Sequence, residues 1–117
     1  DGYHLGGQII PGLRMLGDAL AADTSDIGAA RHKPVTLDDP TDMFATTTTM
    51  AVAHGSLNAI CGAIERSLDV LSESGLSPVL VLTGGDASRI LDVLGSTPEM
   101  RSHLVLNGLA HMVQSNA

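Results

Sequence analysis

The chain has 117 residues, enough for one domain, and a formal net charge of −7. This charge disfavours binding to nucleic acid or to an anionic membrane surface, because both need a positive face. The hydrophobic share is 44% with one Tyr, one Phe and no Trp, so a core must be built from aliphatic side chains and Met. No apolar run reaches the roughly 20 residues that span a bilayer, and no signal peptide is visible.

The first element is a predicted strand over Tyr3 to Ile10, interrupted by the paired glycines Gly6 and Gly7. Two adjacent glycines allow a tight turn and close approach of the backbone to another group. A helix is predicted from Pro11 to about Ala22, because proline suits a first helical turn and apolar residues recur at spacings of three and four. Those residues are Leu13, Leu16 and Leu20.

A loop and then the longest helix are predicted next. Residues 23–42 carry Asp, Thr, Gly and two prolines, which is typical of a loop. The helix is expected to begin as early as Asp42, whose side chain could cap it, and to end near Gly75. A helix of about 30 residues would be about 45 Å long and would overhang so small a domain, so part of it should pack on another domain or subunit. Its apolar stripe comprises Leu57, Ile60, Cys61, Ile64, Leu68 and Leu71.

Two further strand–helix units complete the predicted order. A uniformly apolar strand over Val79 to Leu82 is typical of a strand covered on both faces, and a helix over about Ala87 to Leu94 follows it. A strand over His103 to Leu106 and a helix from Gly108 onward are expected last. Alternation of strands and helices predicts an α/β fold with about three parallel strands and right-handed crossovers.

No cluster of side chains in the sequence predicts a metal site or a catalytic nucleophile. The five histidines lack metal-ligand spacing, and His54 and His111 are expected at partly exposed positions on helices. The only cysteine, Cys61, excludes an internal disulfide; it reads as a small buried hydrophobe and favours a reducing compartment, the cytoplasm. No Walker-type phosphate loop is present. The acidic residues Asp38, Asp39 and Asp42 could suggest a cation site but are interpreted as part of a solvated loop.

Four motifs in order resemble the C-terminal half of a type III pantothenate kinase. They are the Gly-Gly-Gln-Ile-Ile-Pro-Gly segment at 6–12, Thr48 seven residues before Gly55, Thr-Gly-Gly-Asp-Ala at 83–87, and Leu-Val-Leu-Asn-Gly-Leu at 104–109. That family belongs to the actin-like, sugar-kinase-like ATP-binding superfamily. The resemblance implies that residues 1–117 are the C-terminal portion of the second actin-like domain, with a ribonuclease H-like fold, in a two-domain kinase whose N-terminal half is absent. The chain starts at Asp1 without Met, which also favours the interpretation that it is one piece of a longer protein.

The resemblance also implies a substrate site. Gly6 and Gly7 would shape the pocket for the pantoate end of pantothenate through backbone N–H groups, whereas a tight turn without a ligand is the plain alternative. Thr48 would hydrogen-bond pantothenate from the neighbouring subunit of a homodimer. Its alternative role is that of a residue at the helix N-terminus bonding its own backbone, and four consecutive threonines leave its register open by one.

The same resemblance implies a nucleotide site. Thr83, Gly84 and Gly85 would lie beside the adenosine of ATP, although a tight turn with Asp86 as a helix N-cap fits equally. The phosphate-binding loop, the catalytic Asp and the ligands of a monovalent cation (potassium or ammonium) precede the segment at 6–12 in the family, and Mg would also be bound outside this chain. No catalytic or metal-binding residue is therefore assigned here, and the fragment alone is expected to be inactive.

The function implied for the whole protein is transfer of the ATP γ-phosphate to pantothenate in coenzyme A biosynthesis. Three alternatives stay open: a non-catalytic accessory or regulatory paralogue, another superfamily member such as a sugar kinase, and a small α/β binding domain that needs no partner. The last predicts that the 117-residue chain folds alone as a monomer.

Overall fold

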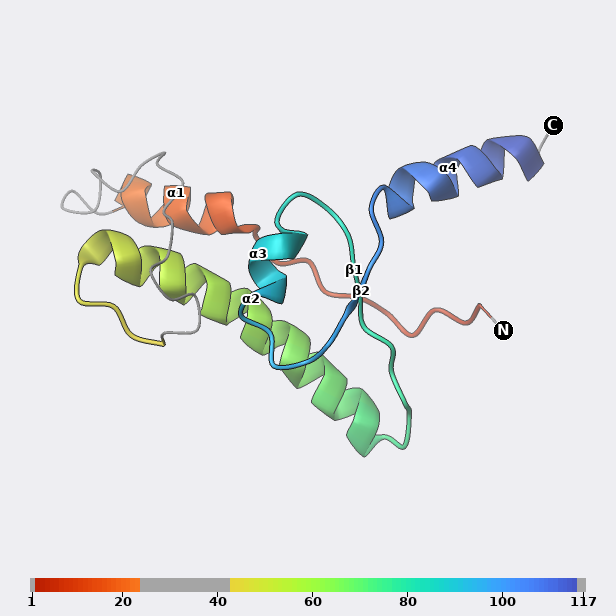
Figure 1. The fold of residues 1–117 in the computed structure, drawn as a ribbon, viewed down its shortest axis with the longest axis horizontal. Coiled ribbons are helices and arrows are strands. Elements are labelled where there is room, and N and C mark those ends of the chain that lie inside the picture. The colour runs from red at the N-terminus through yellow and green to blue at the C-terminus, as the bar shows by residue number, and fades with distance from the viewer. Residues whose placement is uncertain (1, 24–42, 116–117) are drawn as a thin grey trace.

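The computed structural model describes residues 2–23 and 43–115, and a long helix, α2 (Thr48–Glu73), runs through its centre (Figure 1). Thr47 precedes it with extended backbone and accepts a hydrogen bond on Oγ1 from Met50 N at 3.4 Å. That cap places the start at Thr48, not at Asp42 as the sequence suggested; Asp42 itself lies outside the described residues. The helix ends next to Gly75, as predicted, and its 26 residues span about 39 Å.

Helix α1 (Leu13–Asp23) packs against the N-terminal half of α2, which confirms the predicted helix with a start two residues later. The two helices approach closely at Gly17, where an added Cβ would lie 3.9 Å from Val52 Cγ1. Leu13 and Ala21 of α1 are buried, and Leu57 of α2, at 2% exposure, is the most deeply buried large side chain of the described residues. The small core therefore forms around α2. The predicted loop over residues 23–42 lies almost wholly outside the described residues.

The segment before α1 does not form the predicted strand over Tyr3 to Ile10. Its residues pair with no strand within the described parts of the chain, and Tyr3, Leu5 and Ile9 are exposed. A strand is completed only when a neighbouring backbone supplies hydrogen-bond partners, so the apolar pattern alone does not produce one. This segment is left with an apolar surface and open backbone groups.

The sheet of the described residues has two parallel strands, β1 (Val81–Leu82) and β2 (Glu99–Met100), instead of the three expected. Glu99 N donates to Leu80 O at 2.8 Å and Arg101 N to Leu82 O at 2.9 Å. Helix α3 (Ala87–Leu91) forms the crossover and packs against α2. Strand β1 falls within the predicted range, but only Leu82 is buried, so the expected cover on both faces is incomplete.

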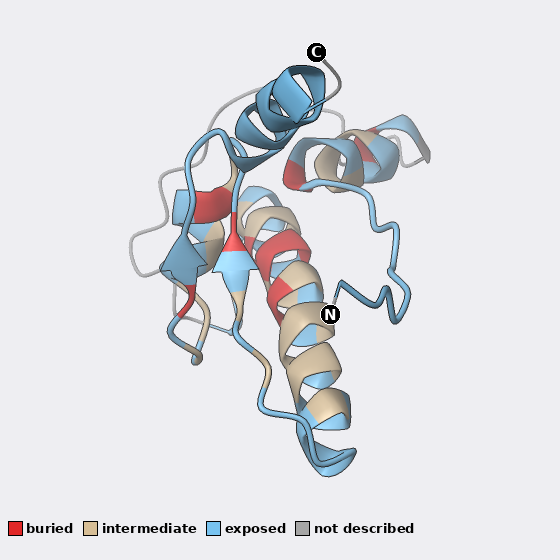
Figure 2. Cartoon of the chain, turned by 90° about the vertical axis from the view of Figure 1, so that its right-hand side faces the viewer, coloured by how far each residue is buried: buried red, intermediate tan, exposed pale blue. Residues whose placement is uncertain are grey.

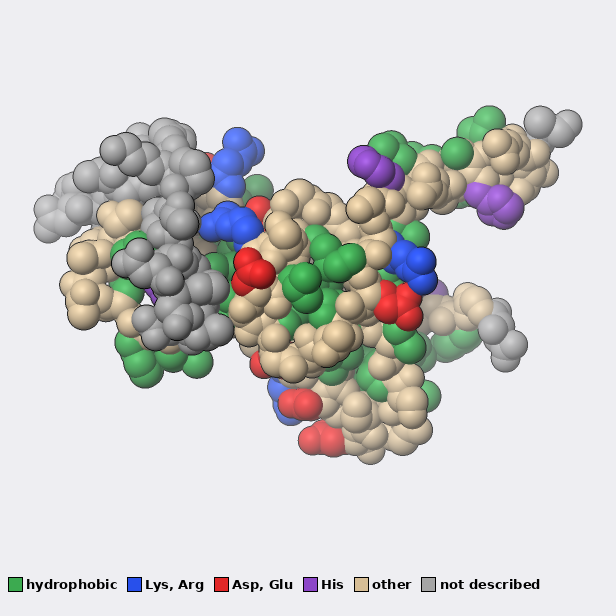
Figure 3. Space-filling model, in the orientation of Figure 1, with side chains coloured by type: hydrophobic (Ala, Val, Ile, Leu, Met, Phe, Trp, Pro, Cys, Tyr) green, Lys and Arg blue, Asp and Glu red, His purple; other side chains and the backbone are tan. Residues whose placement is uncertain are grey.

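The predicted strand over His103 to Leu106 is wrong, because Leu104 begins helix α4 (Leu104–Ser115). A short apolar run suits either a strand or a buried helix face, and periodicity cannot distinguish them. Every residue of α4 is exposed (Figure 2). Its hydrophobic side chains lie open on the surface (Figure 3), and the largest are Leu104, Val105, Leu106, Leu109, Met112 and Val113.

The overall dimensions agree with this incomplete cover. The Cα radius of gyration is 17.1 Å, whereas a compact domain of this length has about 13 Å. Helices with a small parallel sheet are consistent with a fragment of an α/β domain. In the part of the chain that the structure describes, no helix combines the length and apolarity needed to cross a membrane.

Candidate functional site

The first candidate corner is formed by Gly6 and Gly7 in the extended segment before α1. Gly6 has φ +133°, a conformation that side-chain-bearing residues rarely adopt. A Cβ added at Gly7 would meet nothing within 4 Å, so the main chain there is open to a ligand. Next to the corner, Gln8 Nε2 donates to Ser67 Oγ at 3.3 Å. This exposed hydrogen bond places the segment beside the C-terminal half of α2.

Thr48 lies at the opposite end of α2. The helix-capping bond is made by Thr47, whereas Thr48 is exposed as the first helical residue. Ser67 follows Thr48 by nineteen residues in the same helix, so about 28 Å separates them. Figure 1 shows the chain before α1 running away from the Thr48 end. One chain therefore does not bring Thr48 to the Gly6–Gly7 corner.

The second candidate corner, Thr83-Gly84-Gly85, connects β1 to α3. Its three residues are exposed. Gly84 has φ +102° and its carbonyl accepts from Ala87 N at 3.3 Å, which turns the chain into the helix. Asp86 occupies the predicted N-cap position of α3, but its side chain makes no capping hydrogen bond and instead pairs with Arg89 at 3.7 Å. The corner thus presents main chain without a capping carboxylate.

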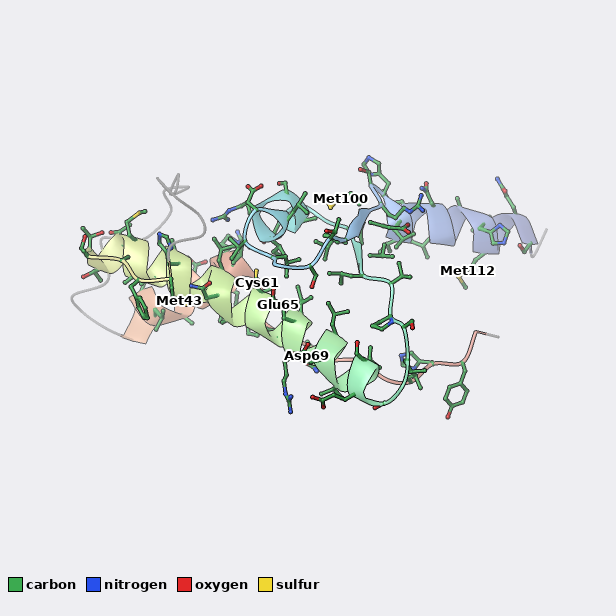
Figure 4. All side chains as sticks on the ribbon, turned by 60° about the horizontal axis from the view of Figure 1, so that its bottom comes forward. Met43, Cys61, Glu65, Asp69, Met100 and Met112 are labelled. Carbon is green, nitrogen blue, oxygen red and sulfur yellow. The ribbon has the colours of Figure 1, made fainter. Side chains whose placement is uncertain are left out.

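Two α2 side chains contact the region around α3. Cys61 Sγ donates to Ile90 O at 3.8 Å, and Glu65 Oε1 accepts from Gly95 N at 2.8 Å (Figure 4). Burial, and secondarily the neighbouring Glu65 carboxylate, raises the pKa of the Cys61 thiol. The interpretation of Cys61 as a buried small side chain is confirmed.

The two helical histidines differ in exposure. His111 on α4 is exposed as expected, but the prediction of an exposed His54 is wrong, because only 4% of that residue is accessible. Its spacing to Leu57 and Cys61, three and seven residues, places it on the buried face of α2 and could have revealed this. Within residues 2–23 and 43–115, no group of three or more His, Cys, Asp or Glu residues is arranged to hold a metal ion.

A family model described as "Type III pantothenate kinase" matches residues 1–69, which is more than half of the chain. The chain belongs to this family. The matched part of this pantothenate kinase family member includes Gly6, Gly7 and Thr48.

Similar proteins extend the comparison across the rest of the chain. The type III pantothenate kinase of Nitrosococcus oceani is 39% identical over 118 residues, which cover 100% of this chain and 42% of that protein. That of Alkalilimnicola ehrlichii is 32% identical, with 98% of this chain and 44% of the relative covered. That of Thiobacillus denitrificans is 31% identical, with 98% and 45% covered. The chain thus spans less than half the length of these three relatives.

Proposed function

We propose that this chain is the C-terminal part of the second actin-like, ribonuclease H-like domain of a kinase that transfers the γ-phosphate of ATP to pantothenate in coenzyme A biosynthesis. The observation that carries the proposal is identity of 31–39% to three type III pantothenate kinases over nearly the whole chain. The chain's own residues bind and orient the two substrates in the cytoplasm, where a single free cysteine stays reduced.

Pantothenate is held by two copies of the chain in this proposal. Backbone N–H groups at Gly6 and Gly7 bind the pantoate end, and the Thr48 hydroxyl reaches it from the other subunit of a homodimer. The 28 Å along α2 supports this division, because pantothenate has about the length of a three-residue peptide, which spans at most about 11 Å. A hydroxyl suits the role, as it both donates to and accepts from the substrate's hydroxyl and amide groups.

The adenosine of ATP binds at the Thr83-Gly84-Gly85 corner in this proposal. The fit rests on the open main chain there: Gly85 has no heavy atom within 4 Å of an added Cβ, and the corner is exposed. When bound, ATP supplies the phosphoryl group. The phosphate-binding loop, the catalytic aspartate and the ligands of Mg and of a potassium or ammonium ion belong to the N-terminal half of the enzyme in this proposal, so the chain alone is inactive.

The exposed surfaces support the requirement for that second half. The segment at residues 2–10, which pairs with no strand of the described residues, and the apolar side chains of α4 need cover that the described residues do not provide. A stand-alone binding domain would instead bury such surfaces itself.

The test uses the full-length protein that contains this sequence. Turnover of ATP is measured with pantothenate and, separately, with hexoses, and thermal-shift titration records which compound binds. ATP-dependent phosphorylation of pantothenate supports the proposal. Phosphorylation of a hexose instead would identify a sugar kinase, and absence of any turnover with intact folding would identify a non-catalytic paralogue; either result rejects it.

A further inference from the structure

We propose that Glu65 is a positioning residue for the nucleotide corner, acting by holding the segment after α3 against α2. The inference rests on the proposed function, because it takes the Thr83-Gly84-Gly85 corner as the adenosine side of the site. Glu65 is not among the residues proposed to contact pantothenate or ATP.

The Glu65 contact joins parts of the chain thirty residues apart. Its Oε1 accepts from the backbone N–H of Gly95 at 2.8 Å, a length typical of a hydrogen bond to a charged carboxylate, and the bond lies in an exposed position. One helical turn earlier, Cys61 Sγ donates to Ile90 O at 3.8 Å. Figure 4 shows Cys61 and Glu65 along α2 near α3. The two side chains together hold the C-terminal end of α3 and Gly95, after which the chain returns to β2, against α2.

The corner itself has few restraints. It lies within a single excursion of the chain that leaves the sheet after Leu82 and returns at Glu99, and each strand has only two residues. Thr83, Gly84 and Gly85 are exposed, and glycine backbone changes conformation at little cost. Helix α3 has only five residues, so it transmits the position of its far end directly to the corner. The bond at Gly95 therefore adds to the packing of α3 on α2 in setting where the corner lies relative to α2.

A contact that only stabilises the fold would affect both substrates alike. A positioning role affects ATP selectively, because pantothenate is assigned to Gly6, Gly7 and Thr48, none of which Glu65 contacts. The variant Glu65→Gln retains an acceptor oxygen without the charge, so it separates loss of the charge from loss of the whole side chain. Asp69, exposed on the next turn of α2, offers a matched control for removal of a carboxylate from this helix.

The experiment measures steady-state kinetics of the full-length kinase as wild type, Glu65→Ala, Glu65→Gln and Asp69→Ala. We expect Glu65→Ala to raise KM for ATP about tenfold, which corresponds to about 1.4 kcal/mol, and to leave KM for pantothenate within about twofold. Glu65→Gln should raise KM for ATP about threefold, and Asp69→Ala should match the wild type.

Equal changes in both KM values, or none in KM for ATP, would overturn the positioning role. If Glu65→Ala does not fold, Glu65→Gln decides alone: a KM for ATP equal to that of the wild type rejects the proposal. A wild-type enzyme that binds ATP without phosphorylating pantothenate would refute the proposed function instead. In that case the ATP dissociation constants of the same variants are measured. Relative to the wild type, they should change by the same factors as those expected for KM for ATP.

Discussion

A mixed dimer tests the division of the pantothenate site between two chains. The perturbation pairs a Gly7→Val chain with a Thr48→Ala chain in the full-length enzyme. A Cβ at Gly7 has no atom of this chain within 4 Å, so valine there should obstruct ligand binding without disturbing the fold. Loss of the Thr48 hydroxyl removes one hydrogen bond of about 0.5–1.5 kcal/mol, which raises KM for pantothenate about two- to twelvefold and leaves KM for ATP nearly unchanged.

The geometry predicts which site of the mixed dimer survives. With about 28 Å between Thr48 and Ser67, which holds the Gly6–Gly7 segment, each site draws these residues from different chains. One site then has both residues intact and the other has neither. At pantothenate concentrations well below KM, the mixed dimer should show about half of wild-type activity, since a twofold dimer has two equivalent sites.

The assay uses two affinity tags to isolate the mixed dimer, followed by a coupled ADP-release measurement. The matched control pairs a wild-type chain with a chain that carries both substitutions, which damages both sites and should give low activity. If the control retained half of the activity while the first pairing fell to the level of its parent variants, both residues would serve one chain's own site, and the reasoning from α2 would be refuted.

The remaining predictions concern the nucleotide corner, the helix cap and the core. Gly85→Ala should fold normally, because its Cβ is unobstructed, yet raise KM for ATP severalfold; unaltered ATP kinetics would remove Gly85 from the site. Thr47→Ala should lower the free energy of unfolding by about 1 kcal/mol through loss of the N-cap, and an equal effect of Thr48→Ala in urea titrations would contradict this assignment of the cap. Leu57→Ala should cost about 2–5 kcal/mol in the same titrations, and a cost below about 1 kcal/mol would show that this position is not a packed core site. Burial raises the pKa of the Cys61 thiol above its ordinary value of 9.0, so near that pH only the unfolded chain ionises this thiol. The free energy of unfolding should therefore be unaffected by Cys61 below pH 9 and should fall as the pH rises further. A Cys61→Ala variant that loses as much stability as the wild type between pH 8 and 10 would refute this.

Local sequence signals sufficed where an element is defined by its own residues. The spacing of apolar residues predicted α1 and α2, because helical hydrogen bonds form within the segment. The start of α2 was misjudged by six residues, since both Asp42 and Thr47 are good capping residues and only the backbone geometry selects between them.

Signals failed where an element depends on distant partners. The apolar pattern over Tyr3 to Ile10 could not show whether a neighbouring strand is present, and Leu-Val-Leu at 104–106 fits a strand or a helix equally. Strand β2 was missed because Glu99 and Met100 form no apolar run and are paired only through the position of β1.

The candidate site was likewise predictable from the sequence only in part. Gly6 and Gly84 were identifiable as corners, and both adopt backbone angles that favour glycine. The contact of Glu65 with Gly95 had no signal in the sequence, because it joins one helix to a loop thirty residues later. The roles assigned to Gly6, Gly7, Thr48, Thr83, Gly84 and Gly85 stay predictions that the kinetic experiments decide.

The rigid length of α2 has a consequence for how such sequences can diverge. Inserting or deleting one residue between Thr48 and Ser67 would turn one end of the helix by about 100° relative to the other and shift it by 1.5 Å. Substitutions can accumulate along this stretch, but changes in its length should be strongly selected against. Aligned family members should therefore keep a constant number of residues between these two positions while their surface side chains vary.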